Sequence, residues 1–178
     1  MVWRIVLGVL LGIVLAAVVT ALFIRNVHRH RDMDYGAGPE VFGKGRRKKA
    51  LVLHQPSMHG HSVQVAQALC RQLEALGWEA TLDYPGHSAV YDPQKYDLLS
   101  FSSAVYLGHV GKPILEYLKT HTFFHKKVLV FTVGTVARDE SDLQELLAAI
   151  PEENLVLSRK FSPRQQVEMM DFVKHALK

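Results

Sequence analysis

Residues 50–70, ALVLHQPSMHGHSVQVAQALC, place an apolar run, a polar loop and a helix-forming segment one after another. Residues 50–54 are short and apolar, as expected of a strand that is buried on both faces. From Val63 onward, apolar residues recur at spacings of three and four, which predicts a helix that Ser62 caps and Gly77 ends. A strand, a loop and a helix in this order are typical of α/β proteins.

The chain after this unit repeats the alternation of strand and helix. Too few residues separate the second and third strands for a helix, whereas the later connections have room for one. We expect an α/β three-layer sandwich in which helices cover both faces of a five-stranded parallel sheet. The further strands are predicted at residues 78–82, 97–102, 127–132 and 154–157, and the further helices at 113–120, 139–150 and 163–177.

An uncharged apolar run of twenty residues, Ile5 to Ile24, lies near the amino terminus. As a helix it would cross the roughly 30 Å hydrocarbon layer of a bilayer. The alternative is a cleaved secretory signal, because residues 19–21 are small and suitably spaced. However, the run is longer than the core of about 7–15 residues typical of a signal, and the positive charge follows it. We therefore expect residues 1–24 to be a transmembrane anchor held in membrane lipid.

The basic residues concentrate beside this anchor. Nine of the 21 Lys and Arg residues, but only three of the 17 acids, lie in residues 1–49. The positive-inside rule places residues 25–178 in the cytoplasm, beneath the cell membrane. We expect residues 25–48 to be a basic flexible linker along anionic headgroups, with a plain stop-transfer flank as the alternative, and residues 49–178 to be the folded domain. Since the positive charge lies in this linker, no nucleic-acid partner is expected.

Within the anchor, Gly8 and Gly12 lie four residues apart, and Ala16 continues the same face. Small residues at this spacing let two transmembrane helices approach closely. The pattern predicts a contact between two copies of the chain, that is, a homodimer.

Neither a metal site nor a catalytic triad is expected. His54, His59 and His61 have no neighbouring Cys or carboxylate to complete a ligand set. The sequence Gly-His-Ser occurs twice, at residues 60–62 and 86–88, but never within a G-x-S-x-G nucleophile motif. Cys70, the only cysteine, lies on the apolar face of its helix and is interpreted as a buried structural thiol.

Three loops follow the first, third and fourth predicted strands, and the carboxyl ends of parallel strands meet at one edge of a sheet. The first, residues 55–62, combines serines, a glycine and a helix start, so that its amides can bind a phosphate without Lys or Arg. The second, residues 102–109, offers Tyr106 as an exposed stacking face, and the third is residues 132–135. A flat ring is expected between the second and third loops.

With these loops, residues 49–178 resemble the flavodoxin-like family, whose phosphate loop is T/S-x-T-G-x-T and whose second loop is commonly S-P-x-Y-x-G. The resemblance implies the strand order 2-1-3-4-5 and an FMN cofactor. It also implies which residues contact FMN: Ser57, Met58, His59, Gly60, His61 and Ser62 at the phosphate, and Ser103, Ala104, Val105, Tyr106, Gly108, Val133, Gly134 and Thr135 at the ring.

Two residues depart from the family pattern: His59 replaces the middle hydroxyl, and Ala104 replaces the proline. His59 and His61 either hydrogen-bond the phosphate, which would favour their protonated forms, or are ordinary loop histidines.

The resemblance implies electron transfer by the bound flavin, without a catalytic side chain. Together with the expected anchor, this predicts a membrane-anchored protein that transfers electrons to or from a membrane-associated partner. One alternative is a quinone-linked flavin oxidoreductase resembling protoporphyrinogen dehydrogenase, for which His109 is the only candidate proton donor. The other is an anchored interaction module that has lost FMN.

Overall fold

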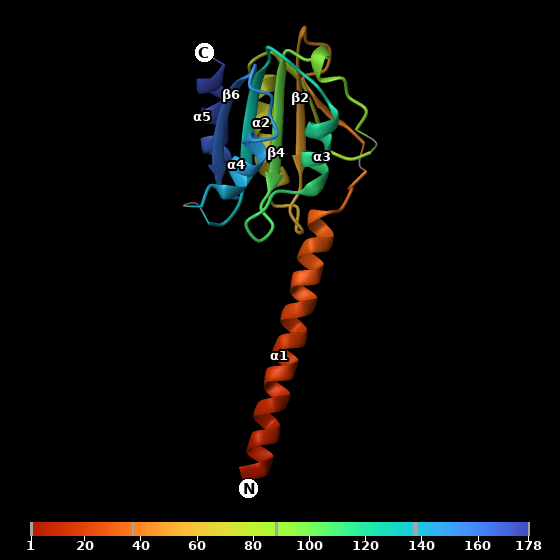
Figure 1. Ribbon diagram of the computed structural model, residues 1–178. Coiled ribbons are helices and arrows are strands. Elements are labelled where there is room, and N and C mark those ends of the chain that lie inside the picture. Colours follow the sequence, from red (N-terminus) through yellow and green to blue (C-terminus); the bar gives the residue numbers. More distant parts are fainter. Residues whose placement is uncertain (1, 37, 88, 137–138, 178) are drawn as a thin grey trace.

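The computed structural model describes residues 2–36, 38–87, 89–136 and 139–177. A helix of 30 residues, α1 (Val2–Arg31), leads into an α/β domain and projects away from one end of it (Figure 1). The domain contains a six-stranded sheet in the order β1-β3-β2-β4-β5-β6. The strands are β1 (Glu40–Phe42), β2 (Lys48–Gln55), β3 (Trp78–Asp83), β4 (Leu98–Ala104), β5 (Lys127–Val133) and β6 (Leu155–Phe161).

Helices cover both faces of the sheet, as expected. One apolar cluster lies between the sheet and the helices α2 and α5, and a second lies between the sheet and α3 and α4. Every residue of β4 is buried, because this central strand is covered on both faces. The helices are α2 (Val63–Ala75), α3 (Lys112–Thr120), α4 (Ser141–Leu147) and α5 (Gln166–Ala176), and Pro93–Lys95 forms a short 3₁₀ turn, η1.

The sheet confirms the predicted fold class. The strands β3, β2, β4, β5 and β6 are mutually parallel and follow the order 2-1-3-4-5. The sixth strand, β1, was not predicted: it pairs antiparallel with β3, Val41 opposite Thr81. Three residues are too few to produce a recognisable alternation in the sequence.

Residues 25–48 contain more regular structure than a flexible linker would have. The helix α1 continues through Arg31, and Asp34 accepts hydrogen bonds from the amides of Gly36 and His87, at 3.0 and 2.9 Å. The strand β1 then joins the edge of the sheet. The folded part of the chain therefore begins within this segment.

The basic turn at residues 43–47 lies at the end of the sheet opposite to α1 (Figure 1). The eight residues of β2 separate the two ends by about 25 Å at 3.3 Å per residue. Salt screens charges over about 8–10 Å. If α1 spans a membrane, this turn therefore lies too far from the bilayer to follow its headgroups, contrary to the expectation, and only the cations at the end of α1 lie next to the span.

Candidate functional site

The loop between β2 and α2 is a closed turn. Gly60 has a φ of +71°, a left-handed conformation that favours glycine, and its amide donates to the Ser57 carbonyl at 2.9 Å. The Ser57 amide donates to Ser62 Oγ at 2.8 Å, and the Ser62 amide donates to Ser57 Oγ at 3.3 Å. The two serines, which were expected to face a phosphate, thus hold the loop together.

The other amides of this loop are available to a ligand. Within the described residues, the amides of Met58, His59 and His61 have no protein hydrogen-bond acceptor. They precede the amino terminus of α2, where unpaired N–H groups and the helix dipole favour an anion. The exposed imidazoles of His59 and His61 stand beside them, with ring centroids 6.3 Å apart. This part of the chain suits a phosphate.

A buried histidine supports the loop from below. His54 Nε2 lies 2.9 Å from Ser62 Oγ, and its Nδ1 lies 2.9 Å from Ser102 Oγ. Because the Ser102 hydroxyl donates to the Leu53 carbonyl, Ser102 Oγ accepts from Nδ1–H, and Nε2 accepts from the Ser62 hydroxyl. Burial lowers the pKa of His54 to about 3, so the ring is neutral at physiological pH.

Ser62 does not cap α2 with its side chain as predicted, because His54 and Ser57 occupy its hydroxyl. Gly77 ends α2 as predicted, with a φ of +82°.

The second loop is a tight hairpin after β4. Tyr106 and His109 form a bridge, and Leu107 and Gly108 between them have positive φ values of 50° and 85°. The Tyr106 ring is buried, its hydroxyl donates to the Pro56 carbonyl, and burial raises its pKa. The expectation of an exposed stacking face at Tyr106 is wrong, because Val27 of α1 packs over this residue.

The third loop packs directly on the second. The Val105 amide donates to the Val133 carbonyl at 3.0 Å, and a Cβ at Gly134 would lie 2.9 Å from Val105 Cγ2. These contacts leave no space for a ring between the roots of the two loops, contrary to the expectation. Gly134 is therefore needed for close packing between the second and third loops.

Residues of all three loops line a pocket of about 360 Å³. Its size falls within the range of about 300–1,000 Å³ that is typical of ligand sites. Ser62, Ser103, Gly60 and Gly108 lie outside its lining, and the first two are buried. The other predicted residues line it together: Ser57, Met58, His59, His61, Ala104, Val105, Tyr106, Val133, Gly134 and Thr135.

Three residues that line this pocket were not predicted from the sequence. Phe23 and Val27 of α1 line it, together with Pro163. Val27 is buried against Ala104 and Tyr106. The apolar run that contains Phe23 predicts a membrane span. Because such a helix is apolar on every side, its sequence does not indicate which side packs against the domain.

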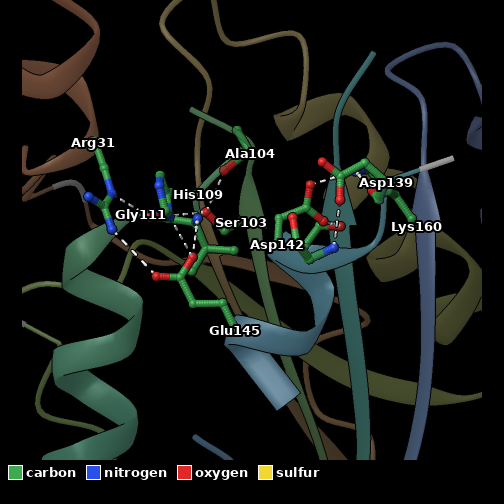
Figure 2. A network of polar contacts seen from close by, with 12 residues as sticks. Arg31, Ser103, Ala104, His109, Gly111, Asp139, Asp142, Glu145 and Lys160 are labelled. Atoms are coloured by element: carbon green, nitrogen blue, oxygen red, sulfur yellow. Dashed lines mark hydrogen bonds and ion pairs between the residues drawn. The ribbon is translucent and has the colours of Figure 1, made fainter. Parts of the chain in front are cut away.

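Two polar networks flank the loops (Figure 2). In one, Glu145 of α4 accepts from the Val110 amide at 3.0 Å and pairs with Arg31 of α1 at 3.4 Å. Arg31 Nε also donates to the Val110 carbonyl at 3.0 Å. Ser103 Oγ accepts from the Gly111 amide at 2.8 Å, which closes the base of the second loop. The end of α1 is thereby fixed to the second loop.

The second network is a buried ion pair under the third loop. Lys160 Nζ lies 2.5 Å from Asp142 Oδ2, and both side chains are almost fully buried. The Thr132 hydroxyl donates to Asp142 Oδ1 at 2.9 Å. The predicted fifth strand ended before Lys160, so the sequence pattern offered no reason to pair these two residues.

A larger hollow, of about 510 Å³, lies between α3 and the segment that includes Gly86, His87, Ala89 and Val90. Asp32, Asp34 and Glu116 line it, and three carboxylates repel a phosphate. Among the described residues, no group of three or more His, Cys, Asp or Glu residues is placed to hold a metal ion.

Comparison with known proteins agrees with the fold. A family model described as a flavodoxin domain matches residues 51–176. The chain is similar to oxidised flavodoxin 2 from Bacillus cereus (19% identity, 72% of this chain and 95% of that chain covered, TM-score 0.53). It is also similar to a flavodoxin from Streptococcus pneumoniae TIGR4 (18%, 72% and 97%, TM-score 0.57) and to a short-chain flavodoxin associated with a bacterial microcompartment (18%, 73% and 97%, TM-score 0.55). Among curated proteins no significant match is found.

The parallel sheet, with three loops at its carboxyl edge, defines an open α/β protein, a class in which ligands bind across this edge. The match over residues 51–176 then identifies the family: the chain belongs to the flavodoxin domain family.

Proposed function

We propose that this protein is a membrane-anchored flavodoxin that binds FMN and transfers electrons. The observation that carries the proposal is the convergence of three loops on one pocket, with unpaired amides at Met58, His59 and His61 on one side. The match to the flavodoxin domain supports a flavin cofactor.

The first loop would hold the phosphate mainly through its backbone. Its amides donate hydrogen bonds to the phosphate oxygens, and the dipole of α2 adds to the attraction. Gly60 keeps the loop curved through its positive φ, whereas the side chains of Ser57 and Ser62 keep it closed. The imidazoles of His59 and His61 add two further donors when protonated.

The remaining walls would position the ring. Met58, Val105, Val133 and Phe23 offer apolar surface that keeps water away from one side of the pocket. When bound, FMN supplies the redox chemistry, and the protein supplies position and electrostatics.

The structure favours an electron carrier over the alternative function, a quinone-linked oxidoreductase with its own proton donor. His109, the candidate donor, does not line the pocket within the described residues, and its Nδ1 lies 3.5 Å from Glu145. It therefore belongs to the contact between the second loop, α1 and α4.

We further propose that α1 spans the cell membrane and leaves residues 25–178 in the cytoplasm. The helix has the length and composition of a membrane span, and none of the residues in its most apolar window is buried against the rest of the described chain. Cell fractionation with an alkaline wash, followed by the mass of the intact chain, tests the proposal. We expect an uncleaved chain in the washed membranes. A chain shortened near Ala21 and released into the soluble fraction would identify the segment as a signal.

The redox proposal is tested on the purified full-length chain in detergent. We expect flavin absorption bands, or their appearance after FMN is added and the excess removed, and repeated bleaching and recovery with dithionite and ferricyanide. A chain that stays colourless after FMN addition would instead support an interaction module without cofactor.

A further inference from the structure

The anchor helix and the pocket share residues. Phe23, within the apolar run, and Val27, one turn later, both line the pocket. One turn of helix rises about 5.4 Å. If the apolar run fills the hydrocarbon layer, the pocket therefore begins within a few ångströms of the lipid boundary.

The end of the anchor is fixed to the domain. Arg31 Nε and Nη2 bond the Val110 carbonyl and Glu145, at 3.0 and 3.4 Å, and the Gln55 side chain donates to the Met33 carbonyl at 3.0 Å. Val27 is buried against the second loop. These contacts join α1 to two loops of the site, so the domain cannot turn freely about its anchor.

The loop tips extend toward the same side as α1. Figure 1 shows the loops after β2 and β4 at the end of the sheet from which α1 emerges. The hairpin of the second loop presents Leu107 at its tip, 56% exposed and held in a left-handed conformation. Phe23 is also 56% exposed, and Met58 is partly buried beside it. An exposed Leu alone needs no explanation, but this one lines the same pocket as Phe23 of α1.

The charges around this rim are compatible with a lipid surface. Arg25 and Arg29 are exposed on α1, and each cation near an anionic surface contributes about 1 kcal/mol. The carboxylate of Glu145 is already paired with Arg31, and the exposed acids Asp139 and Glu140 lie beyond the third loop.

We propose that the rim formed by Phe23, Met58 and Leu107 rests in the interfacial layer of the bilayer, so that the pocket opens toward lipid. The inference rests on the proposed membrane anchor and adds a second lipid contact, made by the loops of the site. A redox partner would then meet the pocket from the membrane side.

Spin labels on the full-length chain, reconstituted in vesicles of phosphatidylcholine and phosphatidylglycerol, test this proposal. Cys70 is buried and is replaced in all variants, Cys70→Ser, so that one introduced cysteine carries the label. Leu107→Cys reports on the rim, Leu11→Cys on the middle of the span, and Arg47→Cys on the opposite end of the sheet. Collision with oxygen and with a water-soluble nickel complex measures the depth of each label.

We expect the label at 107 to collide with the nickel complex several-fold less often than the label at 47, and more often than the label at 11. A label at 107 as accessible as that at 47, with a deep label at 11, would overturn the rim contact and leave the anchor intact. A water-accessible label at 11 would overturn the anchor as well. The label at 107 could also show spin–spin broadening that disappears when unlabelled chain is added. This result would mean that Leu107 contacts a second copy of the chain and not lipid, and it would also overturn the proposal.

Discussion

His54 is an uncharged hydrogen-bonding link between the first loop and the central strand. Each ring nitrogen has one hydroxyl partner, and Phe131 stacks on the ring at a centroid distance of 6.0 Å. A proton on Nε2 would remove the acceptor of the Ser62 hydroxyl and place a charge in the core. The conformation of the first loop therefore depends on neutral His54. The sequence pattern places this residue at the end of a strand and does not indicate its role.

The first prediction concerns pH. The pKa of His54 falls from an ordinary 6.5 to about 3 on folding. Between these values only the unfolded chain binds the proton, so stability is lost as the pH falls, by up to about 1.4 kcal/mol per pH unit. We expect urea unfolding of the His54→Asn variant, followed by circular dichroism in detergent, to depend less on pH in this range. Equal pH dependence in the two proteins would contradict the role of His54.

The second prediction concerns the turn at Gly60. A valine there must adopt a φ of +71°, which is strained for a β-branched residue, and the loop would open to relieve the strain. We expect Gly60→Val to weaken FMN binding at least about tenfold, since one charge-assisted hydrogen bond contributes about 1.5–3 kcal/mol.

Gly45 provides the matched control, because it also has a positive φ and open space around it, at the opposite end of the sheet. Gly45→Val should leave FMN affinity unchanged in the same fluorescence titration. An equal loss of affinity in both variants would mean that the effect comes from general destabilisation.

The third prediction concerns the buried pair of Lys160 and Asp142. Removal of one partner leaves a buried charge and typically costs about 3–5 kcal/mol, whereas replacement of both partners by apolar residues is often neutral. We expect Lys160→Met to lower the free energy of unfolding by this amount, and the double variant Lys160→Met/Asp142→Leu to recover much of the loss. A double variant no more stable than the single one would show that the charges contribute little.

At the scale of elements, the strands β2 to β6 could be predicted because a buried parallel sheet requires continuous apolar runs, such as Leu51 to Leu53 and Val128 to Phe131. Their order came from the resemblance to the flavodoxin-like family, because an apolar run does not say which strand it pairs with. The three loops could be predicted because they follow such strands. The packing of α1 could not, since it depends on single long-range contacts such as Arg31 with Glu145. The short edge strand β1 was missed because it pairs through its backbone, which any sequence can do.

The fourth prediction separates the contributions of Glu145 and Arg31. Their ion pair is partly exposed and contributes about 0–1 kcal/mol, but Glu145 also accepts from the Val110 amide. We expect Glu145→Ala to speed hydrogen exchange of the Val110 amide markedly, and Arg31→Ala to do so less. Arg29→Ala, on the exposed side of α1, is the control that should change nothing. The same exchange rate at Val110 in all three variants would contradict the role of Glu145 and Arg31 in holding this residue.

At the scale of the whole molecule, the helix α1 and the pocket at the three loops form one unit. The helix α1 supplies two walls of the pocket, and the basic turn that follows β1 lies at the far end of the sheet. The family match covers residues 51–176, so α1 lies outside the part of the chain that matches the flavodoxin domain. The predicted contact between two copies through Gly8 and Gly12 stays a prediction.

The central claim is that the amides of the first loop hold the phosphate of FMN. The most direct measurement compares FMN with riboflavin, which has the same ring but no phosphate, by fluorescence quenching on the full-length chain. One or more charge-assisted hydrogen bonds predict that FMN binds at least about tenfold more tightly. Equal affinities for the two flavins, or no binding of either, would contradict the claim.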